Sequence, residues 1–323
     1  MPAPPPDADR AGANRLLFGC MGLGGGWNRN PISADDMRTA HAAIDAALEA
    51  GIDRFDHADI YTFGKAEETF GRVLRERPAL RERVRLQSKC GIRFADAAGP
   101  KRYDLSAEWI RASVDGSLAR LGVERIELLL LHRPDPLMEP EEIAAAFDAL
   151  RAQGKVARLG VSNMHAGQMQ ALERSLPEQL AALQIELSLT ALGWLEEGVL
   201  AGQAAGAGVG FTAGTLEHCR ARGIEVQAWG ALCQGRLSGR PLDGAPESVR
   251  AAAACVADLA ARHGTSREAV VLGFLLAHPA RVHPVIGTTD PERIAACAAA
   301  NTLRLQREDW YRLYEAARGG ELP

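Results

Sequence analysis

Eight short apolar runs recur along the chain, and segments with a helical apolar face separate most of them. The runs are apolar on both faces, as expected for parallel strands that are covered on both sides. A closed (β/α)8 barrel explains eight such alternating units better than an open sheet does. We therefore predict an α/β protein, a TIM barrel in a single domain, with strands in the runs Leu16–Met21, Gly51–Phe55, Val84–Ser88, Ile126–Leu131, Val156–Val161, Leu183–Leu187, Ile224–Ala228 and Val282–Ile286.

Local signals mark the beginnings of several helices. Ser33 stands before two acidic residues, and Ser106 stands before a segment of helical periodicity, so both residues are predicted N-caps. The segment from Thr265 to Glu268 has the spacing of a capping box ahead of another helix. Apolar periodicity also predicts helices over residues 139–150 and 307–317.

Two stretches depart from this alternation. Residues 1–14 are rich in Pro, Ala and Asp and predict a disordered N-terminal arm, which leaves residues 15–323 for the barrel. Residues 196–210 are rich in Gly and Ala and have no clear period, so we predict a mobile loop there, either an inert insertion or a lid over the site. No Pro- or Ser-rich linker divides the chain.

Composition and charge exclude several classes of partner. The net charge of −4 provides no basic excess, which argues against nucleic acid as a partner. Six scattered cysteines without a CxxC pair indicate reduced thiols in a cytosolic protein. The beginning of the chain does not read as a signal peptide, and no apolar run reaches the ~18 residues that a membrane span needs. We expect a cytoplasmic protein without a membrane partner.

Four chemically reactive side chains stand just past the ends of three of the apolar runs. Asp56 and Tyr61 follow the second run, Lys89 follows the third, and His132 follows the fourth. In a barrel of parallel strands, residues at the carboxyl ends of different strands meet at one mouth, where such enzymes keep their chemistry. The sequence therefore predicts one converging site.

These residue types suit the protonation of an alkoxide as it forms on a carbonyl group. A tyrosine phenol titrates near ~10, and a nearby cation such as Lys89 lowers the pKa of that phenol. Asp56 can hold the ammonium group in place, and His132 can orient the substrate oxygen or donate a hydrogen bond to it. The hydride must come from elsewhere, which requires a nicotinamide cofactor.

Each of these residues also has an ordinary structural explanation. An Asp–Lys pair at a barrel rim is usually a salt bridge, a lone Tyr after a strand is usually packing, and His132 could cap a turn. Only the joint occurrence of the four in this order favours a catalytic site.

Two rival chemistries fit the sequence less well. The segment Asp56–Asp59 contains metal-ligating residue types, but no His-x-His pair is present and Lys89 would repel a cation, so we expect no metal site. Residues 22–26 follow a strand and are rich in Gly, but they miss the GxGxxG spacing and no helix begins there. This excludes a Rossmann dinucleotide-binding unit.

Six motifs of the chain carry a resemblance to a known family. In order, they are Phe55–Tyr61, Ser88–Gly91, Leu131–Asp135, Gly160–Asn163, Gln184–Glu186 and Ile286–Arg293. On these motifs the chain resembles the aldo-keto reductases from about Leu16 to Leu303, and three of the motifs look like the bacterial YdhF-type oxidoreductase branch. The resemblance implies a (β/α)8 barrel and an NADP(H)-dependent carbonyl reductase.

The resemblance also implies roles for individual residues. It makes Asp56, Tyr61, Lys89 and His132 a catalytic tetrad, with Tyr61 as the general acid in reduction, and it lays NADP(H) across the barrel mouth. Ser162, Asn163 and Gln184 match the positions that hold the nicotinamide carboxamide, and Trp229 matches the aromatic residue that stacks on the nicotinamide ring. The other implied cofactor contacts are Gly22, Gly230, Leu232, Gly235, Arg236, Ile286, Gly287, Thr288 and Arg293.

The chain departs from the family at the adenosine end of the cofactor. Many members carry a Lys where this chain has Gly287, and a Glu and an Asn where it has Ala296 and Cys297. Thr288 and Arg293 remain, and a guanidinium group binds phosphate oxygens in a bidentate manner. We therefore expect a preference for NADP over NAD, but a weakened one.

The substrate and the alternative function are less constrained. We expect a small-molecule carbonyl substrate in a pocket walled by Trp27, Phe63, Arg93 and residues 193–210, although no motif identifies the ligand. The alternative is a cofactor-binding regulatory subunit with little turnover, as in the channel-associated members of the superfamily, because the intact tetrad does not exclude such a role.

Overall fold

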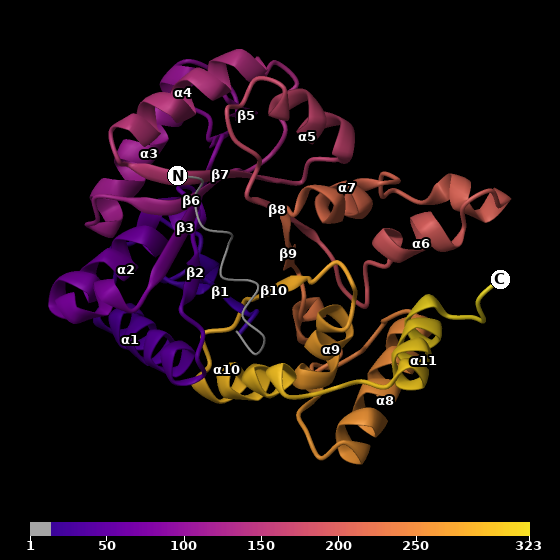
Figure 1. Cartoon of the computed structure of the whole chain (residues 1–323). Helices are drawn as coiled ribbons and strands as arrows, with labels where there is room; N and C mark the ends of the chain where they lie inside the picture. The colour runs from indigo at the N-terminus through magenta and orange to yellow at the C-terminus, as the bar shows by residue number, and fades with distance from the viewer. Residues whose placement is uncertain (1–13) are drawn as a thin grey trace.

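The computed structural model describes residues 14–323, and these residues form a closed barrel of eight parallel strands in one domain (Figure 1). Its strands are β1 (Leu17–Gly19), β2 (Arg54–Asp56), β3 (Arg85–Cys90), β6 (Ile126–Leu131), β7 (Val156–Ser162), β8 (Ala182–Glu186), β9 (Glu225–Trp229) and β10 (His283–Ile286). Around the barrel they follow the order β1, β10, β9, β8, β7, β6, β3, β2.

The helices surround the strands as an outer ring (Figure 1). Within the described residues they are α1 (Ala34–Glu49), α2 (Lys65–Glu76), α3 (Ala107–Leu121), α4 (Pro140–Ala152), α5 (Ala166–Glu173), α6 (Gly193–Val199), α7 (Thr215–Arg222), α8 (Glu247–Arg262), α9 (Arg267–Leu276), α10 (Pro291–Ala298) and α11 (Arg307–Arg318). A small antiparallel sheet of β4 (Ile92–Arg93) and β5 (Arg102–Tyr103) lies between β3 and α3. No helix of residues 14–323 combines the length and the apolar character that a membrane crossing needs.

The predicted barrel is confirmed: each of the eight apolar runs overlaps one of its strands. The first strand is shorter than predicted, because the chain turns into a 3-10 helix at Cys20. Ser33 caps α1 in a capping box with Asp36, and Ser106 caps α3, as predicted. The predicted N-terminal arm, residues 1–14, lies outside the described residues except for Asn14, whose side-chain amide donates to the carbonyl of Ala50.

Two local predictions were wrong in detail. Ser266 caps α9 in place of Thr265, since its hydroxyl accepts the Ala269 amide. The Gly- and Ala-rich stretch 196–210 is not simply a loop, because it carries the end of α6 and a 3-10 helix over residues 204–208. Tertiary contacts hold this weakly helical sequence in place: Glu196 accepts hydrogen bonds from the Tyr314 hydroxyl at 2.6 Å and from Arg318 at 3.1 Å.

The interior of the barrel is more polar than the apolar runs of the sequence predicted. Successive residues of a strand point to opposite faces, so residues two apart share the inner face. Lys89 follows Gln87 in β3 in this way, and both side chains are buried. The runs predicted to be apolar on both faces therefore have one apolar face toward the helices and, in several strands, a polar face toward the barrel axis.

Helices α2 and α3 approach each other closely at Gly71. A Cβ atom on Gly71 would lie 2.1 Å from the carbonyl oxygen of Arg120 and 2.8 Å from the carbonyl carbon of Leu121. Both atoms belong to the backbone, so they cannot move aside as a flexible side chain could. A glycine is therefore required where the two helices meet beside β2 and β3.

We predict that Gly71→Ala destabilises the protein by about 1–3 kcal/mol, because the added methyl group forces two packed helices apart. Urea unfolding followed by circular dichroism measures the change. Gly198→Ala in α6 is the matched control, because a Cβ atom there would meet nothing within 4 Å. We expect Gly198→Ala to leave stability unchanged or to raise it by up to about 1 kcal/mol, and equal effects of the two substitutions would contradict this account.

Candidate active site

The predicted tetrad lies at the carboxyl ends of three neighbouring strands. Asp56 is the last residue of β2, and Tyr61 begins the 3-10 helix that follows in the β2–α2 loop. Lys89 is the penultimate residue of β3. It therefore lies within the strand, whereas the sequence placed it just past the end of the strand. His132 comes directly after β6. Because β2, β3 and β6 are adjacent in the barrel, the four side chains share one side of its mouth.

Lys89 is the centre of this group. Its buried ammonium nitrogen lies 2.7 Å from each carboxylate oxygen of Asp56, 2.9 Å from the carbonyl oxygen of His57 and 2.9 Å from the hydroxyl oxygen of Tyr61. Burial alone would lower the pKa of Lys89, but Asp56 and Tyr61 outweigh burial and raise it. Lys89 is therefore a fixed cation directly beside the phenol.

The pKa of Tyr61 differs from the expectation. Burial raises the pKa of the phenol, and the neighbouring Asp56 adds to this effect, so that together they outweigh the lowering by Lys89. Lys89 lowers this pKa as expected, but burial outweighs its effect, so the pKa lies above its ordinary value and Tyr61 stays protonated at neutral pH. The phenol is a proton donor in this state.

A strained turn fixes Tyr61 in this position. The two residues after it, Thr62 and Phe63, have φ angles of 48° and 61°, in the left-handed region that a β-branched residue such as threonine rarely adopts. The buried hydroxyl of Thr62 donates to the carbonyl of Leu23 at 3.1 Å, which ties this turn to the β1–α1 loop. Backbone strain of this kind persists only where the surroundings hold it, as they often do at functional sites.

His132 is a neutral imidazole in the described structure. Burial, Lys89 and Arg133 all lower its pKa, to well below the usual value of 6.5. Its ring lies 5.9 Å from the Tyr61 ring in an edge-to-face arrangement, and its buried Nδ1 atom has no hydrogen-bond partner. A neutral imidazole has one N–H group, which can donate to a substrate oxygen without supplying a charge.

The residues that the resemblance assigns to the cofactor occupy the rest of the mouth. They lie in or after the five strands β7, β8, β9, β10 and β1, which are consecutive in the barrel. Their side of the mouth thus faces the side that carries the tetrad. By element they are Ser162 and Asn163 at β7, Gln184 in β8, Trp229 at the end of β9, Gly230, Leu232, Gly235 and Arg236 after it, Ile286, Gly287 and Thr288 at β10, Arg293 in α10, and Gly22 after β1.

Asn163 joins the two sides. Its amide nitrogen donates to the carbonyl of His132 at 3.2 Å and to the hydroxyl of Ser162 at 2.8 Å, and its amide oxygen accepts from the indole N–H of Trp229 at 2.9 Å. Its φ of 58° places it in the left-handed region, where Asn is tolerated better than most residues. The orientation of the Trp229 ring is thus coupled to the position of His132.

Gln184 is turned toward the barrel interior. Its amide nitrogen lies 3.0 Å from Asp56 Oδ1 and 3.0 Å from Gln227 Oε1, which uses both of its N–H groups. A carboxamide would therefore meet the amide oxygen of Gln184 and not its nitrogen.

Three features of the mouth bear on the expected binding of an extended dinucleotide. A Cβ atom on Gly287 would meet nothing within 4 Å, so the backbone at the end of β10 borders open space. Gly230, Cys233, Gln234 and Gly235 all have positive φ, which makes a tightly coiled loop beside Trp229. Arg293 donates to the Ser238 hydroxyl at 3.0 Å and to Glu268 at 3.2 Å. Glu268 partly neutralises the cation that was expected to meet a 2′-phosphate.

The predicted pocket wall contains an aromatic cluster. Trp27 is half exposed and packs edge-to-face on Phe63 at 5.7 Å between ring centroids, and Phe94 follows at 5.1 Å from Phe63. The guanidinium of Arg29 lies 4.9 Å above the Phe63 ring. The third predicted wall residue, Arg93, is instead held by Asp96 and Asp104 and lies 4.1 Å over the Trp109 ring. Trp27 and Phe63 are thus brought together, whereas Arg93 is committed to other contacts.

Sequence reasoning missed three groups of this site. Phe94 and Arg29 complete the aromatic cluster. Phe94 could have been found from the sequence, because it directly follows the predicted wall residue Arg93. Ser238, whose hydroxyl accepts a hydrogen bond from Arg293, belongs to no sequence motif and could be found only from the tertiary structure. Among residues 14–323, no group of three or more His, Cys, Asp or Glu side chains could hold a metal ion.

A parallel barrel that gathers an acid, a phenol, an amine and an imidazole at its mouth belongs to the enzymes that work at the carboxyl ends of barrel strands. The chain belongs to the aldo/keto reductase family, whose sequence model matches residues 15–318. The resemblance inferred from the sequence motifs is thereby confirmed.

Individual relatives refine this assignment. The 6-dehydroglucose reductase of Novosphingobium aromaticivorans is 39% identical over 92% of this chain and 92% of its own length. Oxidoreductase YdhF of Escherichia coli is 35% identical over 87% of this chain and 88% of its own, which is consistent with the predicted branch. Among solved structures, the glycerol dehydrogenase of Gluconobacter oxydans is 26% identical with a TM-score of 0.74, and the match covers 94% of this chain and 90% of that chain.

A second buried acidic group lies behind the tetrad. Burial and the neighbouring Glu67 raise the pKa of Asp59 to about 7, against the lowering effect of Arg120. Glu67 itself accepts the Ser88 hydroxyl at 2.6 Å and the guanidinium of Arg120 at 2.8 Å, whereas the buried Oδ1 of Asp59 has no hydrogen-bond partner. Arg120 is thus bonded to Glu67 and not to Asp59, and a pKa of about 7 leaves Asp59 partly protonated at neutral pH.

We predict that this proton makes stability depend on pH. The folded state raises the pKa of Asp59 from 3.8 to about 7, so the stabilisation is complete below pH 3.8 and is lost as pH rises through 7. The loss is at most about 4 kcal/mol. Asp59→Asn removes it, so urea unfolding should show a smaller decrease in stability between pH 5 and pH 8 than in the wild type.

Asp115→Asn is the control for this experiment, because the Asp115 side chain is 56% exposed and pairs with Lys155 at the surface. It should keep the pH dependence of the wild type. If Asp59→Asn also keeps it, Asp59 is not the group that titrates.

Proposed function

We propose that the protein is an NADP(H)-dependent oxidoreductase that reduces aldehydes or ketones to alcohols by hydride transfer, with Tyr61 as the general acid. The observation that carries this proposal is the contact of 2.9 Å between the Tyr61 hydroxyl and the Lys89 ammonium, which Asp56 holds in turn at 2.7 Å. Membership of the aldo/keto reductase family supports the reaction class.

The cofactor would supply the hydride, and this chain's residues would bind it on the tryptophan side of the mouth. The indole of Trp229, oriented by Asn163, offers a flat face to the nicotinamide ring. The Ser162 hydroxyl, the Asn163 side chain and the amide oxygen of Gln184 are the polar groups for its carboxamide. Arg293, Thr288 and the loop from Gly230 to Arg236 would hold the phosphates and the adenosine end.

The tetrad would manage the proton. Tyr61 is protonated at neutral pH because its pKa is raised, so its hydroxyl can donate the proton that the reduced carbonyl oxygen needs. Lys89 stabilises the phenolate that remains, and the N–H group of neutral His132 donates a hydrogen bond to the same substrate oxygen. In alcohol oxidation the same groups work in reverse, with the Tyr61 phenolate as the base.

The substrate class proposed here is a sugar aldehyde. A relative that is 39% identical is named a 6-dehydroglucose reductase, that is, an enzyme for glucose oxidised to an aldehyde at carbon 6. In this chain the half-exposed Trp27 ring and the Phe63 ring beside it offer an apolar surface at the mouth. The C–H face of a pyranose ring packs well on such a surface, while its hydroxyl groups remain free for polar partners.

We predict that 6-dehydroglucose is turned over faster than a short aliphatic aldehyde when NADPH oxidation is followed at saturating cofactor. Glucose is the matched negative control, since it has an alcohol at carbon 6. Equal rates for the sugar aldehyde and the aliphatic aldehyde would contradict the substrate class. NADPH binding without turnover of any aldehyde, ketone or alcohol would instead favour a cofactor-binding regulatory subunit.

We predict that Tyr61→Phe lowers kcat by at least about 100-fold, because general acid catalysis contributes on this order. NADPH binding, measured by quenching of tryptophan fluorescence, should stay within about twofold, since the substitution removes one hydroxyl and keeps the ring in place. Tyr103→Phe is the control, because Tyr103 lies exposed in β5. Unchanged turnover in Tyr61→Phe would remove this residue from the mechanism.

A further inference from the structure

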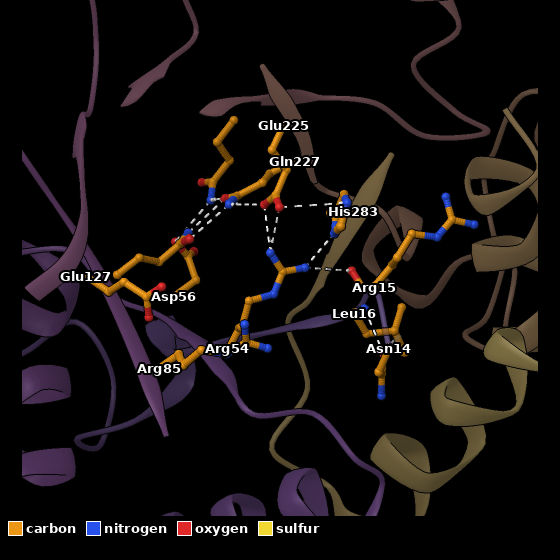
Figure 2. A network of polar contacts seen from close by, with 12 residues as sticks. Asn14, Arg15, Leu16, Arg54, Asp56, Arg85, Glu127, Glu225, Gln227 and His283 are labelled. Carbon is orange, nitrogen blue, oxygen red and sulfur yellow. Dashed lines mark hydrogen bonds and ion pairs between the residues drawn. The ribbon is translucent and has the colours of Figure 1, made fainter. Parts of the chain in front are cut away.

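A continuous polar network runs through the barrel interior from the tetrad to the opposite end of the strands (Figure 2). Asp56 stands at one end of it, and Arg54, Glu225 and His283 stand at the other. The middle is a layer of three buried glutamines, Gln87 of β3, Gln184 of β8 and Gln227 of β9, which we call the glutamine layer. All three are at most 5% exposed, so their amide groups depend on hydrogen-bond partners within the protein interior.

The glutamine layer delivers its N–H groups to Asp56. The amide nitrogens of Gln87 and Gln184 lie 2.5 Å and 3.0 Å from Asp56 Oδ1, and each of them also donates to Gln227 Oε1, at 2.8 Å and 3.0 Å. Both N–H groups of each amide are thus used, one toward Asp56 and one toward Gln227. Asp56 Oδ1 therefore accepts from two amides as well as from Lys89.

The direction of these bonds depends on Gln227. Its amide nitrogen donates to Gln87 Oε1 at 2.9 Å and to Glu225 Oε1 at 2.8 Å, which leaves its oxygen to face the other two amides. If the Gln227 amide were reversed, its N–H groups would face the N–H groups of Gln87 and Gln184. Those two glutamines would then lose an acceptor and could not keep their present orientation toward Asp56.

Glu225 determines which way Gln227 points. A carboxylate is only an acceptor, so the side of Gln227 that meets it must be the N–H side. Burial disfavours the charge of Glu225, but Arg54, His283 and Gln227 outweigh burial and lower its pKa to about 2. Arg54 donates to both carboxylate oxygens at 2.8 Å and contacts His283 Nδ1 at 2.5 Å. Glu225 therefore stays an ionised acceptor over the whole range of working pH.

We propose that Glu225, acting through Gln227, is a positioning residue for the active site: it sets the direction of the glutamine layer and thereby holds Asp56 against Lys89. For catalysis this inference rests on the proposed function, because Asp56 has a role only if the tetrad carries out the chemistry. The residues involved lie on β2, β3, β8 and β9, so the layer also ties the tetrad side of the mouth to the cofactor side.

Glu225→Gln tests the direction of the layer with almost no change in side-chain volume. Arg54 donates to both oxygens of Glu225 and Gln227 donates to Oε1, so a glutamine at position 225 can meet Gln227 with its oxygen or with its N–H groups. The direction of the Gln227 amide is then no longer fixed, and Asp56 loses amide donors whenever that amide reverses. Gln227→Met removes the same link by deletion, and Gln87→Met is the replacement variant if Gln227→Met does not fold.

Glu127→Gln is the matched control. Glu127 lies at the amino-terminal end of β6, its side chain is 41% exposed, and it pairs with Arg158 at 3.2 Å. Within residues 14–323, none of the hydrogen bonds that form the glutamine layer involves Glu127. It undergoes the same chemical change as Glu225→Gln at the same end of the barrel. Any general cost of replacing a paired glutamate near the barrel floor appears in both variants.

Two measurements report on the orientation of the glutamine layer. The first is kcat at saturating NADPH with the substrate that the wild type turns over. Loss of hydrogen bonds to a charged group should lower kcat on the order of tenfold in Glu225→Gln and Gln227→Met, with NADPH binding within about twofold. The second is the ionisation of Tyr61, followed by ultraviolet absorbance as pH rises and isolated by subtracting the titration of Tyr61→Phe.

The titration should move to higher pH in Glu225→Gln. With fewer N–H groups on Asp56, its negative charge is less neutralised and disfavours the Tyr61 phenolate more strongly. A residue with a merely structural role would lower the unfolding temperature without moving this titration. The phenol titration needs no turnover, so it decides the inference even if the proposed reaction fails in the wild type.

The outcomes separate as follows. A titration of Tyr61 that moves in Glu225→Gln but not in Glu127→Gln supports the positioning role. Coincident titrations in the two variants overturn it, as does a kcat in Glu225→Gln equal to that of Glu127→Gln in an active wild type. A wild type with no turnover removes the proposed reaction but leaves the titration to judge the glutamine layer by itself.

Discussion

The buried ion pair between Lys89 and Asp56 is the contact on which the rest of the site depends. Burying two charges costs more free energy than an isolated pair usually returns, so such a pair survives only where further hydrogen bonds satisfy it. Here Lys89 also meets the His57 carbonyl and the Tyr61 hydroxyl, and Asp56 receives two glutamine amides. The pair therefore places a permanent cation beside the phenol and gives β2 and β3 a common polar interior.

A polar network lies below this ion pair and occupies part of the barrel interior. One part of the barrel interior contains apolar side chains such as Leu128 and Leu130, as in an ordinary barrel core. Another part contains Asp56, the glutamine layer and the Glu225–Arg54 pair, in which the amide N–H groups of the three glutamines all meet acceptors. A satisfied network of this kind is rigid because each group fixes the direction of the next one. The side chains at the mouth that contact this network are held in place by it.

The two sides of the mouth are joined at a second point, through Asn163. It connects the backbone of His132 to the indole of Trp229, so the proposed hydrogen-bond donor to the substrate oxygen is coupled to the proposed platform for the nicotinamide. The outer parts of the site are held differently. Arg293 shares its charge with Glu268, and α6 depends on contacts with α11. The centre is thus fixed by buried polar bonds, and the rim by ion pairs and contacts nearer the surface.

The sequence by itself determined the barrel and the four residues of the tetrad. Alternating apolar runs and helical segments are local patterns, and residues at strand ends converge in any parallel barrel, so both follow from chain order alone. The tertiary structure alone decided the pKa of Tyr61, because burial and distance to Lys89 compete there. It also decided the glutamine layer, since Gln87, Gln184 and Gln227 are far apart in sequence and meet only when the barrel closes. Which side chain donates and which accepts is decided in the closed interior of the barrel, and no local sequence pattern predicts it.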